Sequence, residues 1–388
     1  MKTNIGVIFG GRSVEHEISV ISALQAINAI DKNKYNVIPI YINKAGKWLT
    51  GDVLLEVETY KSEEKIIKEC TEIIIDTHSN NFNLYKKTLW SLKLIASVDV
   101  VFPVIHGSNG EDGTLQGFLE LKNIPYVGSN VLSSSTGMDK IVMKMILKES
   151  GLPVVDYLWF YDKEWHINKQ EILKKINKLA YPLIVKPSNL GSSVGITTAK
   201  NEEELESAVE LAGEFSNRIL VEKLVSDLQE INCSVIGNSD KQNASVCEEP
   251  LKSGDILSYN DKYTTKGGNS KGMSSAKRQI PAQIAPELTK QIQELAKQTF
   301  KVLNSGGVAR IDFLINKKDN TVYVNEINSI PGSLSFYLWE ASDMDFTMLT
   351  NELIELALKQ NREKENYMVS YNQNIFSLNT NSLKLGKG

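Results

Sequence analysis

The sequence predicts an α/β fold of two or three domains, with a parallel sheet in the N-terminal part and an α+β arrangement toward the C-terminus. Short apolar runs, which are typical of buried parallel strands, alternate with segments of helical periodicity in the first part of the chain. The chain has 388 residues, more than one compact domain usually contains. With 41% hydrophobic residues, it has apolar material for more than one core.

Composition excludes several classes of protein. The net charge is −4, and the Lys and Arg residues are too scattered to form a nucleic-acid-binding surface. No stretch approaches the roughly 18 consecutive apolar residues of a membrane helix, and the apolar run at the N-terminus is too short for a signal peptide. The three cysteines, Cys70, Cys233 and Cys247, fit neither a disulfide framework nor a zinc site. We therefore expect a cytoplasmic protein without a nucleic-acid or membrane partner.

The first predicted domain covers residues 1–128. Its first strand, residues 4–9, is a continuous apolar run that ends in Gly10-Gly11, as a buried parallel strand entering a tight turn does. The elements predicted after it alternate in type: a helix over 13–30, strands over 36–42 and 98–105, a helix over 113–122 and a short strand over 125–128. Residues 44–96 are polar and rich in Lys and Glu, and we interpret them as an elaboration on this domain.

Two further domains are predicted, at residues 129–223 and 224–388. The first of them has helical and strand patterns in alternation: a helix over 139–150, a strand over 181–187, a Gly/Ser turn over 191–195, a helix over 201–212 and a strand over 218–224. The last domain is predicted to contain a strand over 230–237, a basic loop over 253–280, a helix over 286–303, strands over 307–315 and 322–328, and a helix over 350–360. Residues 361–388 are polar and are predicted to form a tail.

Two of these strands predict a metal site. Successive side chains of a strand point to opposite faces, so Arg310 and Asp312 share one face, and Glu326 and Asn328 share one. A hairpin that joins the strands brings two carboxylates and an amide oxygen together, a donor set that suits Mg²⁺ with substrate phosphates. The alternative is a solvated sheet face with an Arg–Asp pair.

Two loops predict phosphate or ligand binding. Lys186 lies at the end of an apolar strand and is followed by a loop of small residues up to Gly195, whose backbone N–H groups can approach phosphate oxygens. The string has neither the P-loop pattern nor a G-x-G-x-x-G fingerprint, which disfavours a dinucleotide dehydrogenase. The segment from His106 to Gly117 follows another buried strand, where ligands bind in parallel sheets; the alternative there is a simple helix-entry turn.

Six ordered motifs give the chain a resemblance to the D-alanine–D-alanine ligases, members of the ATP-grasp superfamily. The resemblance extends from about residue 4 to 358 and implies three domains, with ATP held between the sheets of the second and third. The matching strings are Gly10 to Ser19, His106 to Gly117, Met138-Asp139-Lys140, Val185 to Gly195, Ala309 to Phe313, and Asn325 to Asn328 followed by Pro331-Gly332.

The resemblance implies a role for each matching residue. The residues implied to bind ATP are Lys140, Lys186, Ser193, Glu222, Lys223, Leu224, Val225, Glu230 and Lys262. Two Mg²⁺ ions, for which Mn²⁺ can substitute, are implied on Asp312, Glu326 and Asn328. The residues implied to bind or activate the substrates are Glu15 and His106 for the first D-alanine, Ser192 and Tyr263 as hydrogen-bond partners of Glu15, Arg310 and Gly332 at the tetrahedral intermediate, and Tyr337 and Leu338 in the pocket of the second substrate. The basic loop 253–280 has the character of a lid.

The implied activity is ATP-dependent formation of D-alanyl-D-alanine for peptidoglycan precursors, by a homodimer. Tyr337 stands where the family usually has a Ser that contacts the second substrate, which leaves D-serine or D-lactate as alternatives. Another ATP-grasp carboxylate–amine ligase is a further alternative, against which Glu15 and His106 argue. A non-catalytic nucleotide-binding protein is disfavoured because the predicted metal ligands are intact.

Overall fold

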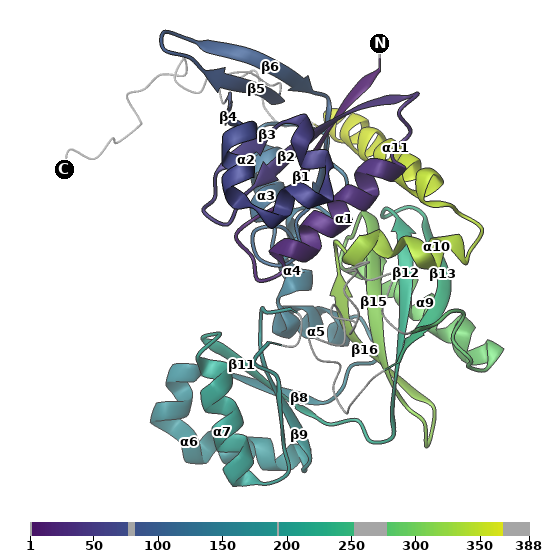
Figure 1. Ribbon diagram of the computed structural model, residues 1–388. Helices are drawn as coiled ribbons and strands as arrows, with labels where there is room; N and C mark the ends of the chain where they lie inside the picture. The colour runs from purple at the N-terminus through teal and green to yellow at the C-terminus, as the bar shows by residue number, and fades with distance from the viewer. Residues whose placement is uncertain (1, 77–81, 192–193, 252–277, 368–388) are drawn as a thin grey trace, which may run out of the picture.

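A computed structural model describes residues 2–76, 82–191, 194–251 and 278–367. These residues form three sheets, each with its own helices (Figure 1). The first sheet has the strand order β6-β5-β4-β3-β2-β1-β7. Its strands are β1 (Thr3–Gly10), β2 (Tyr35–Ile42), β3 (Trp48–Thr50), β4 (Thr71–Ile75), β5 (Phe82–Lys87), β6 (Leu92–Val98) and β7 (Val100–Val104).

Only the centre of the first sheet is parallel. Strand β1 pairs in parallel with β2 and β7, whereas β3 to β6 add antiparallel strands beyond β2. The polar segment 44–96 therefore extends the sheet beyond β2. The segment 125–128 forms a single bridge, Val101 to Tyr126, instead of a strand. The helical segments are α1 (His16–Ala29), η1 (Asp52–Leu55), η2 (Val57–Lys61), α2 (Glu63–Glu69), α3 (Thr114–Leu121) and α4 (Val131–Met138).

The tight turn after β1 depends on glycine. Gly10 has a φ of 86°, and a Cβ atom there would come within 2.3 Å of the carbonyl oxygen of Ile42. Only glycine combines this backbone conformation with so close an approach. Helix α1 begins at His16, three residues after the start predicted from the sequence. Glu15 directly precedes this helix, whose Ser19 hydroxyl accepts from the Gly10 N–H of β1 and donates to the Val104 carbonyl of β7.

The second sheet is antiparallel, with the order β10-β9-β11-β8. Helices α6 and α7 cover one face of it (Figure 1), and Phe160, Trp165 and Val209 belong to the core between them. The elements are β8 (Tyr157–Tyr161), α6 (Asp162–Ile176), η3 (Asn177–Leu179), β9 (Leu183–Pro187), β10 (Thr197–Ala199), α7 (Glu202–Gly213) and β11 (Arg218–Lys223). The β8–α6 pair was not predicted from the sequence.

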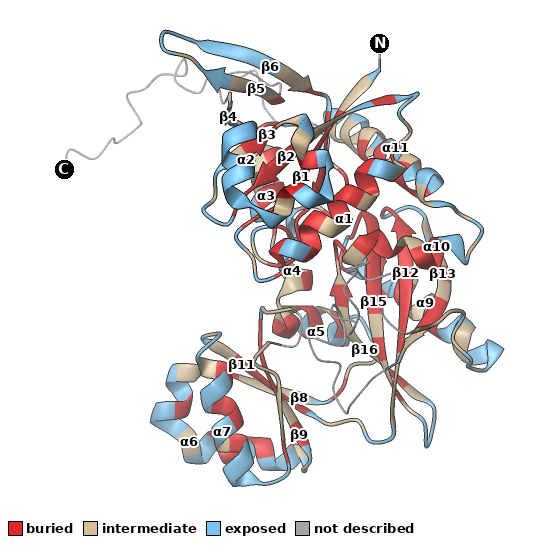
Figure 2. Cartoon of the chain, viewed as in Figure 1, coloured by how far each residue is buried: buried red, intermediate tan, exposed pale blue. Residues whose placement is uncertain are grey.

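The third sheet is also antiparallel, with the order β14-β13-β12-β15-β16. Its elements are β12 (Leu228–Gly237), β13 (Gln242–Pro250), β14 (Arg278–Gln279), α9 (Pro286–Val302), β15 (Gly307–Asn316), β16 (Thr321–Asn328), η5 (Gly332–Ser335) and α10 (Phe336–Glu340). Figure 2 shows the buried stretches of β12 and β15. Helix α5 (Lys140–Glu149) also packs here, because Met143 and Leu147 share a core with Ile311 and Phe313.

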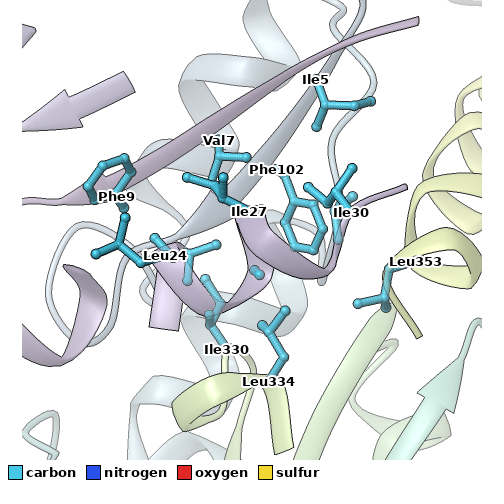
Figure 3. Close-up of a cluster of buried hydrophobic side chains, with 14 of the residues drawn as sticks. Ile5, Val7, Phe9, Leu24, Ile27, Ile30, Phe102, Ile330, Leu334 and Leu353 are labelled. Carbon is cyan, nitrogen blue, oxygen red and sulfur yellow. The ribbon is translucent and has the colours of Figure 1, made fainter. Parts of the chain in front are cut away.

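The last helix returns to the first sheet. Helix α11 (Phe346–Glu365) extends past residue 361, where the tail was predicted to begin. Leu353 lies in the same core as Ile5 and Val7 of β1 and Ile27 of α1 (Figure 3). Helices α1 and α11 therefore cover one face of this sheet, and the C-terminal part of the chain is anchored on the N-terminal unit. No helix of the described residues is long and apolar enough to cross a membrane.

Candidate active site

A pocket lies where the three units face one another. Glu15 and His106 line it from the first unit, Lys186 from the second, and Arg310 and Asp312 from the third. The other predicted residues that line it are Lys140, Glu222, Lys223, Leu224, Val225, Glu230, Glu326, Asn328 and Gly332. Residues from all three predicted domains thus surround one space.

The predicted metal residues lie side by side on β15 and β16. Arg310 pairs with Asn328 in the strand register, and Asp312 pairs with Glu326. Arg310 donates two hydrogen bonds to Asp312, at 2.6 and 2.7 Å, and the Asn328 amide donates to the same carboxylate at 3.2 Å. Ile311 and Phe313 are fully buried on the other face. Strand alternation therefore predicted correctly which side chains share the polar face.

The donor set of this polar face suits a hard cation. It contains two carboxylates and one amide, and among the described residues no three His, Cys, Asp or Glu side chains gather as a metal-binding group. A Mg²⁺ ion commonly takes one or two protein carboxylates and completes its shell with water and substrate phosphates. Both carboxylates contact a cation: Arg310 pairs with Asp312, and Lys140 Nζ lies 3.4 Å from Glu326. The residues therefore fit Mg²⁺ bound together with a phosphate ligand.

A buried ion-pair cluster holds the predicted phosphate-binding lysine. Glu222 on β11 lies 2.5 Å from the Lys186 ammonium and 2.6 Å from that of Lys144 on α5. All three side chains are almost inaccessible to solvent. Burial alone would raise the pKa of Glu222, but the two lysines outweigh it and lower that pKa to about 2. Lys186 also donates to Asn325 on β16, at 3.3 Å, so the cluster connects the second and third sheets.

Lys144 was missed in the sequence analysis. It lies four residues after Lys140, on the same face of α5, and this helical spacing was the available signal. Lys140 Nζ donates to the carbonyl of Leu190 in the small-residue loop, at 2.7 Å. The Asp139 carboxylate caps the helix by accepting from the backbone N–H groups of Ile141 and Val142. Helix α5 therefore provides two lysines near the pocket. Lys144 contacts Glu222 of the second sheet, and Lys140 contacts Glu326 of the third.

Glu15 lies against two glycine loops at the first unit's end of the pocket. A Cβ atom on Gly107 would come within 2.7 Å of Glu15 Oε2, and one on Gly191 within 3.2 Å of the same atom. Burial and the Glu15 charge raise the pKa of the neighbouring Glu111 to about 8. Glu111 accepts hydrogen bonds from the backbone N–H groups of Gly107 and Ile330, each at 2.8 Å. Glu111 lies within the motif from His106 to Gly117, but no role was predicted for it.

His106 is a buried histidine that lines the pocket and connects two segments of the chain. Its Nδ1 lies 2.8 Å from the carbonyl of Ile330, and its Nε2 lies 2.8 Å from the hydroxyl of Ser22. Burial lowers its pKa, which favours the neutral ring at neutral pH. His106 thereby ties the loop after β16 to helix α1.

The remaining predicted residues divide into two groups. Ser192, Ser193, Lys262 and Tyr263, together with nearly all of the predicted lid 253–280, lie outside the described residues. Tyr337 and Leu338 are buried on α10 and are not among the residues that line the pocket.

The fold and the pocket define the class of protein. Two sheets that enclose lysines and a carboxylate face, next to a parallel-sheet unit, form the architecture of an ATP-grasp enzyme. The family models described as the N-terminus and the C-terminus of D-ala D-ala ligase match residues 4–129 and 146–355. The chain therefore belongs to the D-alanine–D-alanine ligase family.

Individual relatives agree over nearly the whole chain. A D-alanine–D-alanine ligase of Thermosipho melanesiensis is 43% identical over 386 residues, which cover 99% of each chain. The solved D-alanine–D-alanine ligase of Coxiella burnetii has 34% identity and a TM-score of 0.78, with 94% of this chain and 96% of that chain covered. A solved D-Ala:D-Ser ligase of Enterococcus faecalis has 32% identity and the same TM-score of 0.78, with 92% and 100% covered.

Proposed function

We propose that this chain is an ATP-dependent ligase that joins two D-alanine molecules into D-alanyl-D-alanine, for peptidoglycan precursors. The observation that carries the proposal is the single pocket in which Lys140, Lys186, Arg310 and the carboxylates of β15 and β16 meet Glu15 of the first unit. Cations and metal-binding carboxylates are the groups needed for phosphoryl transfer to a carboxylate. We expect a homodimer.

In the proposed reaction, the carboxylate of the first D-alanine attacks the γ-phosphorus of ATP, and ADP leaves. The amine of the second D-alanine, after losing a proton, attacks the resulting acyl phosphate, and inorganic phosphate leaves as the peptide bond forms. Both steps build negative charge on oxygen. Lys140 and Lys186 are proposed to neutralise the ATP phosphates, and Arg310 and the Gly332 N–H to stabilise the tetrahedral intermediate. Glu15 is proposed to hold the ammonium of the first D-alanine.

The metal and nucleotide assignments belong to the same proposal. Asp312, Glu326 and Asn328 would hold two Mg²⁺ ions, or Mn²⁺ in their place. Such ions supply positive charge to the β- and γ-phosphates. The adenine is proposed to lie along residues 222–225 and the ribose near Glu230, both of which line the pocket. Ser192, Ser193, Lys262 and Tyr263 keep their proposed roles on the strength of their motif positions.

A second candidate is a ligase that uses D-serine as the second substrate. Tyr337 stands in place of the usual Ser, and a D-Ala:D-Ser ligase is among the similar structures. The two candidates share the first step and the metal site. Product mass therefore decides between them when D-alanine is offered together with D-serine or D-lactate.

The test is phosphate release from ATP with D-alanine and Mg²⁺. We expect release to require both, and Glu326→Gln to abolish it, because the amide cannot replace a charged ligand beside the phosphates. The control Glu171→Gln removes a carboxylate whose ion pair with Lys175 lies on the surface, and should leave the rate unchanged. Turnover without a divalent cation, or full activity of Glu326→Gln, would refute the metal assignment.

A further inference from the structure

The loop after β16 presents one backbone donor to the pocket. Gly332 lines the pocket, and its N–H donates to no acceptor among the described residues. The residues around it differ, because Pro331 has no N–H, and the N–H groups of Ile330 and Ser333 both donate to side chains of the first unit. Within residues 330–333, the Gly332 N–H is therefore the one that a bound ligand can use.

The Glu111 carboxyl group holds the backbone of Ile330. Its Oε1 accepts from the Ile330 N–H and its Oε2 accepts from the Gly107 N–H, each at 2.8 Å. The Glu111 N–H donates in turn to the Gly107 carbonyl, at 2.9 Å. The carboxyl group therefore joins the loop after β7 to the loop after β16, with one N–H on each of its oxygens.

His106 and Ser22 hold the same loop at two further points. A carbonyl oxygen only accepts hydrogen bonds, so His106 Nδ1, 2.8 Å from the Ile330 carbonyl, carries the ring proton. In the neutral ring Nε2 then accepts from the Ser22 hydroxyl, at 2.8 Å. The Ser22 oxygen accepts from the Ser333 N–H, at 2.9 Å. This chain of hydrogen bonds begins at Ile330 and ends at Ser333, on either side of Gly332.

The side chains of the loop are held by the first unit as well. Ile330 and Leu334 are buried in the core that also contains Leu24 and Ile27 of α1 (Figure 3). Leu334 and Ser333 have φ values of 53° and 52°, in a region that residues with a side chain rarely adopt. Such a backbone persists only while its surroundings determine it. The loss of one contact therefore allows the loop to shift.

We propose that Glu111 is a positioning residue for the second step of the reaction. Together with His106, it fixes the Ile330 backbone and thereby directs the Gly332 N–H toward the oxygen that becomes negative in the tetrahedral intermediate. This inference rests on the proposed ligase function, and it gives Glu111 a role that needs no contact with a substrate. A displacement of about 1 Å can cost on the order of 100-fold in rate.

The test compares the binding of a tetrahedral and a planar ligand. The tetrahedral ligand is the phosphinate analogue of D-alanyl-D-alanine, whose phosphorus carries two oxygens, and the planar ligand is D-alanyl-D-alanine itself. The Kd of the phosphinate for the full-length enzyme with Mg²⁺ and ADP is measured by calorimetry, and that of the dipeptide by competition with the phosphinate. We expect the wild type to favour the phosphinate, and Glu111→Gln to reduce this preference about tenfold or more.

The substitution and the readout are matched to the proposed role. Glutamine keeps the size of the side chain but replaces one acceptor oxygen with an NH₂ group. That group faces the N–H of Gly107 or of Ile330, so one of the two hydrogen bonds is lost. Both ligands occupy the same two amino-acid sites, and a ratio of Kd values does not depend on how much enzyme is folded. A merely structural role of Glu111 would therefore leave the ratio unchanged.

Three further variants complete the design. Glu64→Gln removes a carboxyl group from the exposed face of α2, in the same unit, and should keep the wild-type ratio. Ser22→Ala breaks the chain from His106 to Ser333 and should reduce the preference for the phosphinate as well. Glu111→Asp has a shorter side chain that cannot reach both N–H groups, and we expect it to reduce the preference. It decides the question if Glu111→Gln yields too little folded protein.

The outcomes separate this inference from the function on which it rests. Failure of the wild type to form D-alanyl-D-alanine from D-alanine, ATP and Mg²⁺ would overturn both. An active wild type with the same Kd ratio in Glu111→Gln, or in Glu111→Asp where that variant decides, would overturn the role of Glu111 alone. An unchanged ratio in Ser22→Ala would overturn the part assigned to His106.

Discussion

The Lys144–Glu222–Lys186 cluster allows a quantitative prediction for Glu222→Gln. The substitution keeps the shape of the side chain but leaves two buried ammonium groups without their shared carboxylate. Lys144 is fully buried, and the Glu222 carboxylate lies 2.6 Å from its ammonium. Removal of one partner from a buried ion pair usually costs about 3–5 kcal/mol, because the remaining charge is uncompensated.

The pKa of Glu222 gives an independent estimate of the same energy. It is lowered from 4.5 to about 2 because Lys144 and Lys186 outweigh the effect of burial. At about 1.4 kcal/mol per pKa unit, the ionised carboxylate contributes about 3 kcal/mol to folding. Because the folded-state pKa is the lower one, this contribution is present above pH 4.5. It is lost as the pH falls toward 2.

The assay is urea unfolding followed by tryptophan fluorescence, since Trp159 and Trp165 lie in the same unit as Glu222. We expect Glu222→Gln to lower the free energy of unfolding by about 3 kcal/mol at pH 7. The difference from the wild type should shrink as the pH falls below 4.5. Glu171→Gln, on the exposed face of α6, should leave the free energy of unfolding unchanged at any pH. A difference below about 1 kcal/mol at pH 7, or one that stays constant from pH 5 to pH 3, would refute this reasoning.

Two further substitutions probe the first unit. Gly107→Ala would place a methyl group 2.7 Å from Glu15 Oε2, at a residue whose φ is +72°. We therefore expect kcat/KM for D-alanine to fall about tenfold or more. An unchanged kcat/KM would contradict the close packing. Ser22→Ala removes the hydroxyl that contacts His106 and accepts from the Ser333 N–H, and should cost about 1–3 kcal/mol in urea unfolding. Ser207→Ala on the exposed face of α7 is its control, and an equal effect of the two would contradict the prediction.

Sequence reasoning succeeded where the information is local. The polar face of Arg310, Asp312, Glu326 and Asn328 follows from strand alternation and one short hairpin, so a period of two was sufficient to predict it. The parallel centre of the first sheet was likewise predicted from apolar runs and glycine turns. In both cases neighbouring residues in the sequence determine the geometry.

The same reasoning failed where distant segments meet. Glu248 and Arg278 are thirty residues apart, and their contact depends on the β13–β14 pairing, which leaves no periodic signal in so short a strand. The motif position of Tyr337 predicted its place in the chain but not its hydrogen bond to Glu248. Helix α5 follows the first domain in the sequence, yet it packs on the third sheet. The buried apolar face of the helix, and not its position in the sequence, determines where it packs.

The loop that carries Gly332 is held in a costly conformation by the N-terminal unit. Ser333, Leu334 and Ser335 all have φ near +50°, and each non-glycine residue in this region costs about 1–2 kcal/mol. The Ser333 N–H donates to Ser22 of α1, and Leu334 is buried in the core beneath that helix.

Such strain persists only where surrounding contacts determine the backbone, and here those contacts come from the unit that also carries Glu15. Glu15, proposed to hold the first D-alanine, and the N–H proposed to stabilise its reacting carboxyl are therefore positioned by contacts with the same unit. The donor needs no reorganisation when charge develops, which is the condition under which a backbone N–H contributes most to catalysis.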